Sequence, residues 1–279
     1  MRLRSLLFVP GDRLERLEKA IASGTDAVIL DLEDSVSLSK KAEAREAVAQ
    51  SLRRPRTRPL LVRVNPLDSG LIADDLTAVL SEDPDGIVLP KAEGAQSLDL
   101  LFGLMGESCV PVLPIATETP AAVFELGSYA RHAERLLGLT WGAEDLPAAI
   151  GATSAREADG RYTPPMEMVR ALALFGAHKA GVPAIETVYP DFRNLEGLAA
   201  YAAQGRRDGF SAMMAIHPAQ IAVINQAFMP SETEIEKARM IIAAFEASPG
   251  VGALQIKGRM IDAPHLKQAR HILKLARDG

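Results

Sequence analysis

The strongest constraint on the fold is a regular alternation of short apolar runs with longer amphipathic segments. Eight runs are rich in Val, Ile and Leu and do not alternate with polar residues, a pattern typical of strands buried on both faces. The runs are Leu6–Val9, Ala27–Leu32, Leu60–Val64, Gly86–Leu89, Val110–Ile115, Leu136–Thr140, Pro183–Val188 and Ala212–Ile216. The segments between them carry apolar residues every three to four positions, as helices with one buried face do.

Strand and helix repeated in this way predict parallel strands with helices outside them. Eight such units within residues 1–230 suit a closed (β/α)8 TIM barrel. An open doubly wound sheet is the alternative, but the sequence PGDRLER after the first run lacks a Gly-rich phosphate fingerprint. Residues 231–279 predict a C-terminal extension with helices at Thr233–Ala247 and Pro264–Arg277, packed on the barrel or on a neighbouring subunit.

Composition narrows the classes of partner. The formal net charge is −5 and aromatic residues are 5%, which gives no basic, aromatic-rich surface for nucleic acid or for an anionic membrane. No apolar stretch reaches the roughly 18–20 residues of a membrane span, and the N-terminus lacks a signal-peptide pattern, so we expect a cytoplasmic protein. The single cysteine, Cys109, excludes an intrachain disulfide and a Cys-based metal site. We expect its thiol to be buried in the core.

Charged residues end seven of the eight predicted strands. The carboxyl ends of the strands in a TIM barrel lie at one face, and catalytic and binding residues are located there. Like charges there repel one another, and a metal ion would resolve the repulsion. Glu118 and Asp145 follow adjacent strands, so they can converge on Mg²⁺, which prefers carboxylate and water oxygens. Buried ion pairs also gather carboxylates, so a structural function stays open for this pair and for Asp31, Glu33 and Asp34.

Two further residues at the predicted rim have alternative interpretations. Arg63, which ends the third strand, can grip a substrate carboxylate with two parallel hydrogen bonds, or it can neutralise Glu33. His217 precedes Pro218 after the eighth strand, and we favour a loop-locking hydrogen bond over catalysis for it.

Nine stretches resemble one known family, the citrate lyase β-subunit-like branch of the HpcH/HpaI aldolase/citrate lyase family. In order they are SLLFVPGDRLERLEKA, DAVILDLEDSV with KKAEAR, LLVRVN, GIVLPKAE, IATET, GAEDLPAAIG, READGRYTPP, AIHPAQIAVINQAFMPS and GRMIDAPHLKQA. The resemblance spans Ser5 to Ala269. It implies a TIM barrel that uses Mg²⁺ and assembles as a homo-oligomer, a homotrimer or a hexamer.

The resemblance also assigns residues. The family's metal-binding carboxylates fall on Glu118 and Asp145, and its substrate-carboxylate arginine falls on Arg63. The acidic cluster of Glu33 and Asp34 corresponds to residues that help to hold metal-bound water and the arginine. The coenzyme A region corresponds to Phe8, Arg13 and Lys19, and the acid/base that reaches a neighbouring subunit's site corresponds to Asp262.

Three departures from the family pattern bear on the substrate. At the fifth strand the family often reads I-E-T-A/P, whereas this sequence reads Ala116-Thr117-Glu118-Thr119 and keeps the glutamate. A lysine that is common in relatives is missing near Met213. At the seventh strand Glu186 replaces an aspartate, and this longer side chain could reshape the pocket. The resemblance implies a Mg²⁺-dependent carbon–carbon lyase that cleaves or condenses a 3-hydroxy acid or its CoA thioester, such as malyl-CoA, citramalyl-CoA or a citryl-type substrate. The alternatives are an aldolase for a free hydroxy-oxo acid and an accessory β subunit of a citrate lyase-type complex.

Overall fold

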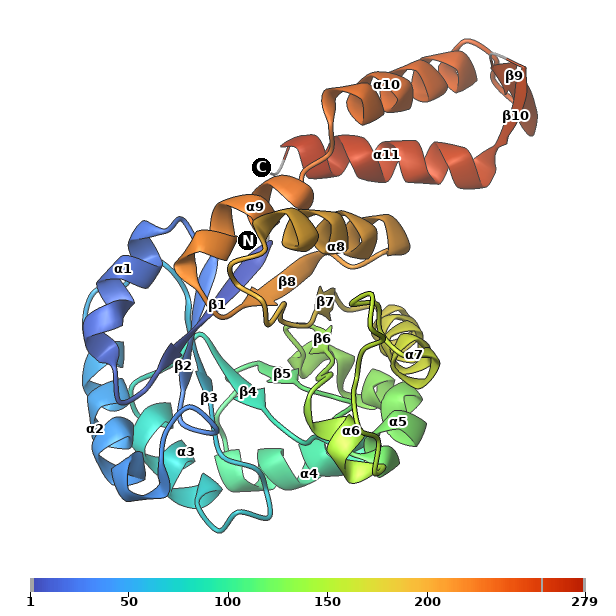
Figure 1. The fold of residues 1–279 in the computed structure, drawn as a ribbon. Coiled ribbons are helices and arrows are strands. Elements are labelled where there is room, and N and C mark those ends of the chain that lie inside the picture. The colour runs from blue at the N-terminus through green and yellow to red at the C-terminus, as the bar shows by residue number, and fades with distance from the viewer. Residues whose placement is uncertain (1–2, 257, 278–279) are drawn as a thin grey trace. The chain divides into compact units, whose positions relative to one another are not determined.

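The computed structural model describes residues 3–256 and 258–277. Its main feature is an eight-stranded parallel sheet with the order β5-β4-β3-β2-β1-β8-β7-β6 (Figure 1). Parallel bridges from Val112 to Leu136 and from Ile115 to Thr140 join the two ends of this order, so the sheet nearly closes on itself. The predicted TIM-barrel fold is therefore confirmed. The strands are β1 (Ser5–Pro10), β2 (Ala27–Asp31), β3 (Leu60–Arg63), β4 (Gly86–Leu89), β5 (Val112–Pro114), β6 (Leu139–Thr140), β7 (Ala184–Glu186) and β8 (Ala212–Ala215).

Helices follow the strands and surround the barrel, as Figure 1 shows. They are α1 (Leu17–Ala22), α2 (Lys41–Leu52), α3 (Ile72–Leu80), α4 (Gly94–Met105), α5 (Pro120–Glu125), α7 (Pro164–Ala180), α8 (Leu195–Asp208) and α9 (Ile221–Ala227). The long connection after β6 contains the short helix α6 (Asp145–Ala149), which the sequence analysis did not predict. A small hairpin follows α6, closed by a bridge between Arg156 and Tyr162.

The interior of the barrel is filled by apolar side chains from seven of its strands. In the parallel register, Leu6 of β1 lies opposite Ala27 of β2 and Met214 of β8, and all three are buried. The full cluster is Leu6, Ala27, Ile29, Leu61, Val88, Leu113, Ile115, Ile185, Ala212 and Met214. Continuous burial of both strand faces explains why the runs show no polar alternation.

The chain separates into two compact units, Leu3–Asn225 and a second unit that begins at Gln226. The second unit contains α10 (Glu232–Glu246), a hairpin of β9 (Ala253–Ile256) and β10 (Arg259–Asp262), and α11 (Ala263–Arg277). It has a small core of its own, formed by Ala238, Ile241, Ile261 and Ala269. The predicted boundary lay at residue 231, and the expectation that this extension packs on the barrel or on another subunit stays a prediction.

Cys109 is exposed, so the expectation of a core thiol was wrong. The reason is that β5 begins at Val112, two residues later than the apolar run, which leaves Cys109 in the preceding loop. No helix among the described residues has the length and apolar character needed to cross a membrane. The cytoplasmic location stays a prediction.

Glu186 is fully buried and belongs to a structural network outside the barrel interior. Its Oε1 accepts hydrogen bonds from Trp141 Nε1 at 2.5 Å and from the Tyr201 hydroxyl at 2.8 Å. Its Oε2 pairs with the Arg170 guanidinium, which also donates to Asp208 at 2.8 Å. Glu186 thus ties β7 to α7 and α8, and its longer side chain does not project into the space enclosed by the strands.

Removal of the Glu186 carboxylate should destabilise the fold. Glu186→Ala leaves the buried Arg170 charge half compensated, which should lower the free energy of unfolding by about 3 kcal/mol. Urea denaturation measures this change. Asp208→Asn is the matched control, because Asp208 is partly exposed and its loss should cost no more than about 1 kcal/mol. Equal stability of Glu186→Ala and wild type would contradict the structural assignment.

Candidate active site

The site begins with an ion pair between two neighbouring strands. Asp31 and Arg63 lie opposite each other in the register of β2 and β3. The guanidinium donates from Nε to Asp31 Oδ1 and from Nη2 to Oδ2, both at 2.7 Å. Burial by itself would raise the pKa of Asp31, but Arg63 outweighs it and holds that pKa below its usual value. Asp31 therefore accepts the two parallel hydrogen bonds of the Arg63 guanidinium that we expected a substrate carboxylate to accept.

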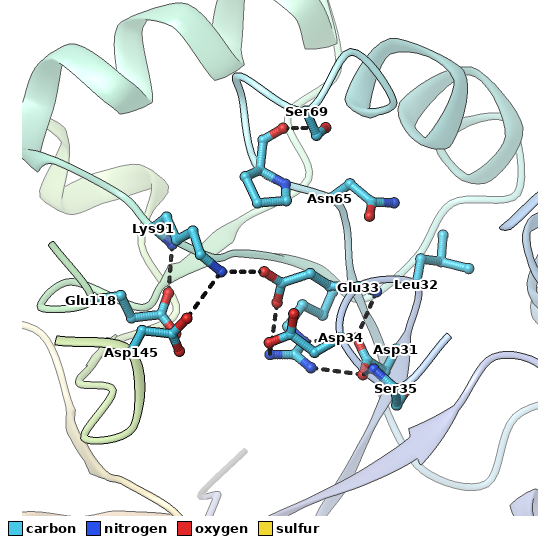
Figure 2. Close-up of polar contacts among 12 residues, drawn as sticks. Asp31, Leu32, Glu33, Asp34, Ser35, Asn65, Ser69, Lys91, Glu118 and Asp145 are labelled. Atoms are coloured by element: carbon cyan, nitrogen blue, oxygen red, sulfur yellow. Dashed lines mark hydrogen bonds and ion pairs between the residues drawn. The ribbon is translucent and has the colours of Figure 1, made fainter. Parts of the chain in front are cut away.

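Asp31 also shapes the acidic loop after β2. Its Oδ1 accepts from the backbone N–H of Glu33 at 2.9 Å, and its Oδ2 accepts from that of Ser35 at 3.2 Å. Lys41 of α2 donates from Nζ to the carbonyls of Leu32 and Glu33 at 2.6 and 2.7 Å. These bonds fix the backbone of the loop and leave the Glu33 side chain pointing into the site (Figure 2).

Glu33 is only 3% exposed and lies between two cations. Its Oε1 accepts from Lys91 Nζ at 2.7 Å, and its Oε2 lies 2.8 Å from Arg63 Nη1. The second contact is not aligned as a hydrogen bond, so among the described residues Oε2 is buried without a hydrogen-bond partner. Burial raises the pKa of Glu33 in spite of both cations. Asp34 differs: it is mostly exposed, and its Oδ2 lies 3.9 Å from Arg63 Nη1.

Glu118 and Asp145 follow the neighbouring strands β5 and β6, and Figure 2 shows their carboxylates side by side. Glu118 is 5% exposed, and its Oε2 accepts from the backbone N–H of Lys91 at 2.6 Å. Asp145 is more exposed, and its Oδ1 lies 3.4 Å from Lys91 Nζ. Burial, with the charges of Glu33 and Asp145 adding to it, raises the pKa of Glu118 to about 8.

Gly142 allows this arrangement. The Thr117 hydroxyl donates to the carbonyl of Gly142 and accepts from its N–H, both at 3.0 Å, which clamps the ends of β5 and β6 together. A Cβ at position 142 would lie 2.6 Å from Glu118 Cγ, closer than real atoms approach. The glycine of the GAED stretch is therefore required by the position of the Glu118 side chain.

The donor set fits a magnesium ion. Among residues 3–256 and 258–277, no group of three His, Cys, Asp or Glu side chains is placed to hold a metal by itself. Mg²⁺ typically binds through one or two carboxylates and keeps water or substrate oxygens in its other positions. Glu118 and Asp145 supply two such carboxylates, which lie side by side in Figure 2.

A cavity of about 780 Å³ opens beside Arg63. Phe8 lines it and lies under the Arg63 guanidinium, 4.8 Å from ring centroid to Cζ. Lys19 and Arg16 also line the cavity from the first helical segment, whereas Arg13 is exposed and is not part of the lining. Of the three residues that the resemblance assigned to coenzyme A, two face one cavity, and the contact of Arg13 stays a prediction.

Three further positions remain to be placed, and one of them, His217, lines the same cavity as Phe8 and Lys19. His217 Nδ1 accepts from the N–H of Ala219 at 3.2 Å and the ring stacks on Phe192, which supports the loop-locking interpretation. Met213, at the position near which relatives carry a lysine, is buried in β8. Asp262 belongs to the second unit, where its Oδ1 lies 2.5 Å from His265 Nδ1, and its acid/base function stays a prediction.

Sequence reasoning missed two residues of this site. Asp31 was left open as structural, yet it positions both Arg63 and Glu33. Lys91 was not singled out from the sequence, yet it contacts Glu33, Glu118 and Asp145. The residue pattern gave no signal for Lys91, because its positive φ of 50°, which is rare for a residue other than glycine, is visible only in the structure.

A closed parallel barrel that gathers buried carboxylates and two cations at the carboxyl ends of its strands defines a TIM-barrel enzyme. The chain belongs to the HpcH/HpaI aldolase/citrate lyase family, whose sequence model matches residues 4–218. The predicted family and the predicted enzyme class, a carbon–carbon lyase, are thereby confirmed.

Three relatives illustrate the similarity. Citrate lyase subunit beta of Haemophilus influenzae is 33% identical, with 99% of this chain and 97% of the relative covered. A (3S)-malyl-CoA thioesterase of Cereibacter sphaeroides is 36% identical, with 98% and 94% covered. The crystal structure of protein CitE from Mycobacterium tuberculosis, in complex with magnesium, acetoacetate and coenzyme A, superposes with a TM-score of 0.88 at 34% identity, with 99% and 98% covered.

A methyl group at position 142 should disturb the carboxylate pair. Gly142→Ala is expected to weaken magnesium binding by about 10- to 100-fold, because the new Cβ displaces Glu118. Isothermal titration calorimetry of the metal-free protein measures this affinity. Gly103→Ala in α4 is the control, since a Cβ there meets nothing within 4 Å. Wild-type affinity in Gly142→Ala would show that the position of Glu118 does not govern metal binding.

Proposed function

We propose that the chain is a magnesium-dependent lyase that cleaves, or in reverse condenses, a 3-hydroxyacyl-CoA that carries a second carboxylate, of the malyl-CoA or citramalyl-CoA type. The observation that carries this proposal is the chain of contacts at the rim of the barrel: Lys91 joins Asp145 to Glu33, and Glu33 in turn lies 2.8 Å from Arg63. The Mycobacterium tuberculosis relative binds magnesium, a small oxo acid and coenzyme A, which is the ligand set that such a reaction needs.

Magnesium is the cofactor, and Glu118 and Asp145 hold it. When bound, it polarises the oxygens of the 2-oxo acid portion of the substrate and stabilises negative charge that develops there. Arg63 holds the carboxylate of the same portion. Asp31 engages two of its five N–H groups, which leaves the two N–H groups of Nη1 and one N–H of Nη2 without a hydrogen bond to Asp31 or Glu33.

The protein must also move protons. A base removes the hydroxyl proton, the C–C bond breaks, and its electron pair passes to the thioester carbonyl as an enolate. An acid then returns a proton to the α-carbon, which yields an oxo acid (glyoxylate or pyruvate) and acetyl-CoA. General acid/base catalysis contributes roughly 10²–10⁴ in rate. Asp262 is the candidate for this step, with the assembly into a homo-oligomer bringing it to a neighbouring barrel.

The coenzyme A moiety fits the cavity beside Arg63. Phe8 supplies an aromatic surface, and Lys19 with Arg16 supplies positive charge for phosphate groups. Arg16 and Lys19 are three residues apart and so share one side of the helical segment. Arg13 lies just before them and completes the basic character of this entrance.

Hydrolysis of the thioester is a second candidate function. It is favoured by one specific observation, the 36% identity to a (3S)-malyl-CoA thioesterase over almost the whole of both chains. In that reaction water attacks the thioester carbonyl, so free malate and coenzyme A would appear without any oxo acid. The two reactions are separated by their products.

The purified full chain should release glyoxylate from malyl-CoA or pyruvate from citramalyl-CoA, together with acetyl-CoA, only when Mg²⁺ is present. Glu118→Gln and Asp145→Asn should each lower this rate at least about 100-fold, because a metal ligand is lost. Oxo acid and free thiol are assayed in parallel. Glu144→Gln is the matched control, since this exposed neighbour of Asp145 has no place in the site.

Each alternative has its own outcome in that assay. Free thiol without oxo acid would establish the thioesterase, and turnover of a free hydroxy-oxo acid without coenzyme A would establish the aldolase. An inactive lone chain that gains activity with citrate lyase partner subunits would establish the accessory subunit. Full lyase activity in EDTA would remove magnesium from the mechanism.

A further inference from the structure

Lys91 has a backbone conformation that its residue type does not favour. It follows β4 and Pro90 with φ at 50°, and among the described residues Asp83 is the other non-glycine residue with positive φ. Lysine has no short polar side chain that could bond locally and stabilise this left-handed conformation. Such strain persists where surrounding contacts fix it, and it gathers at functional sites.

The conformation lets one residue contact three carboxylates from three different loops. The backbone N–H of Lys91 donates to Glu118 Oε2 at 2.6 Å. Its ammonium lies 2.7 Å from Glu33 Oε1 and 3.4 Å from Asp145 Oδ1 (Figure 2). The contact to Asp145 is the longest of the three and the most exposed, so it is the one most easily exchanged.

The charges around Lys91 are unbalanced without it. Arg63 is engaged by Asp31 and Glu33. In the part of the chain that the structure describes, Lys91 is the only cationic side chain within ion-pair distance of Asp145, and Glu118 has no cationic side chain within that distance. Like charges repel strongly where protein lowers the local dielectric. Lys91 therefore joins the three carboxylates in the metal-free protein: its ammonium pairs with Glu33 and Asp145, and its backbone N–H holds Glu118.

We propose that Lys91 is a positioning residue that acts as the resident counter-cation of the magnesium site and that magnesium displaces its ammonium from Asp145. This inference rests on the proposed function, because it needs the metal at Glu118 and Asp145. In the metal-bound site the ammonium keeps Glu33, to which its contact is shorter. Lys91 thus stabilises the empty site and makes metal binding weaker and more reversible than three bare carboxylates would.

A purely structural interpretation of Lys91 makes a different prediction. If the position served only the turn after β4, glycine would suit it better, because glycine adopts positive φ without strain. Lys91→Gly keeps the backbone N–H that holds Glu118 and removes the ammonium. Lys91→Met keeps the length of the side chain and removes only the charge, so together the two variants separate charge from conformation.

The test is calorimetric titration of MgCl₂ into metal-free wild type, Lys91→Met and Lys91→Gly, each as the full chain. Both variants should bind Mg²⁺ about tenfold more tightly than wild type, because a neighbouring positive charge is gone. Thermal unfolding should show a lower midpoint for metal-free Lys91→Met and a larger rise on saturation with Mg²⁺ than in wild type. Lys40→Met is the matched control, since this exposed lysine pairs with Glu43 and should leave both quantities unchanged.

The outcomes distinguish the two proposals. If wild type binds no Mg²⁺, the proposed function fails. If wild type binds Mg²⁺ but both Lys91 variants bind it equally or more weakly, the counter-cation inference alone is overturned. Should Lys91→Met be too unstable to titrate, Lys91→Gly decides the question, because relief of the positive-φ strain offsets part of the lost ion pairing.

Discussion

The ion pair between Asp31 and Arg63 is the interaction on which the rest of the site depends. Strand register alone places the two residues opposite each other, so the barrel fixes this pair before any loop is considered. Asp31 then holds the backbone of the acidic loop, which presents Glu33 to both Arg63 and Lys91. Lys91 in turn connects Glu33 to the carboxylates that follow β5 and β6. Loss of the first pair would leave a buried charge unpaired and would release the loop at the same time.

Much of this architecture could be predicted from the sequence, because strands buried on both faces appear as short apolar runs that alternate with amphipathic helical segments. All eight strands were located, and the rim residues Arg63, Glu118 and Asp145 were identified from their positions at strand ends. The pairing of those residues was not predictable. Periodicity does not say that Asp31 takes the bidentate face of Arg63, or that Glu186 turns outward to Arg170 and Tyr201. These choices depend on which face of a short strand a side chain occupies and on contacts between elements distant in sequence.

Lys91 shows a different limit of sequence reasoning. Its side chain is ordinary in composition and hydropathy, and its importance lies in a backbone angle that no residue pattern reports. Gly142 is similar, because glycine is needed there for the space that a missing Cβ leaves to Glu118, and not for a turn conformation. In both cases the family motifs, GIVLPKAE and GAEDLPAAIG, mark the positions, while the structure supplies the physical reason. The resemblance thus included both positions in its motifs without assigning a function to either residue.

The arrangement is also relevant to the different activities for which relatives with the same fold are named. Of the groups that would bind metal or the oxo acid portion, Arg63 ends β3, whereas Glu33, Glu118 and Asp145 lie in the segments that follow β2, β5 and β6 at the same face of the barrel. The candidate acid/base, Asp262, belongs to the second unit and not to the barrel. A rigid site that stabilises negative charge on oxygen assists both a C–C cleavage and a thioester hydrolysis. The chain is 33% identical to a citrate lyase subunit and 36% identical to a thioesterase over almost its whole length, so overall similarity does not choose between the two reactions.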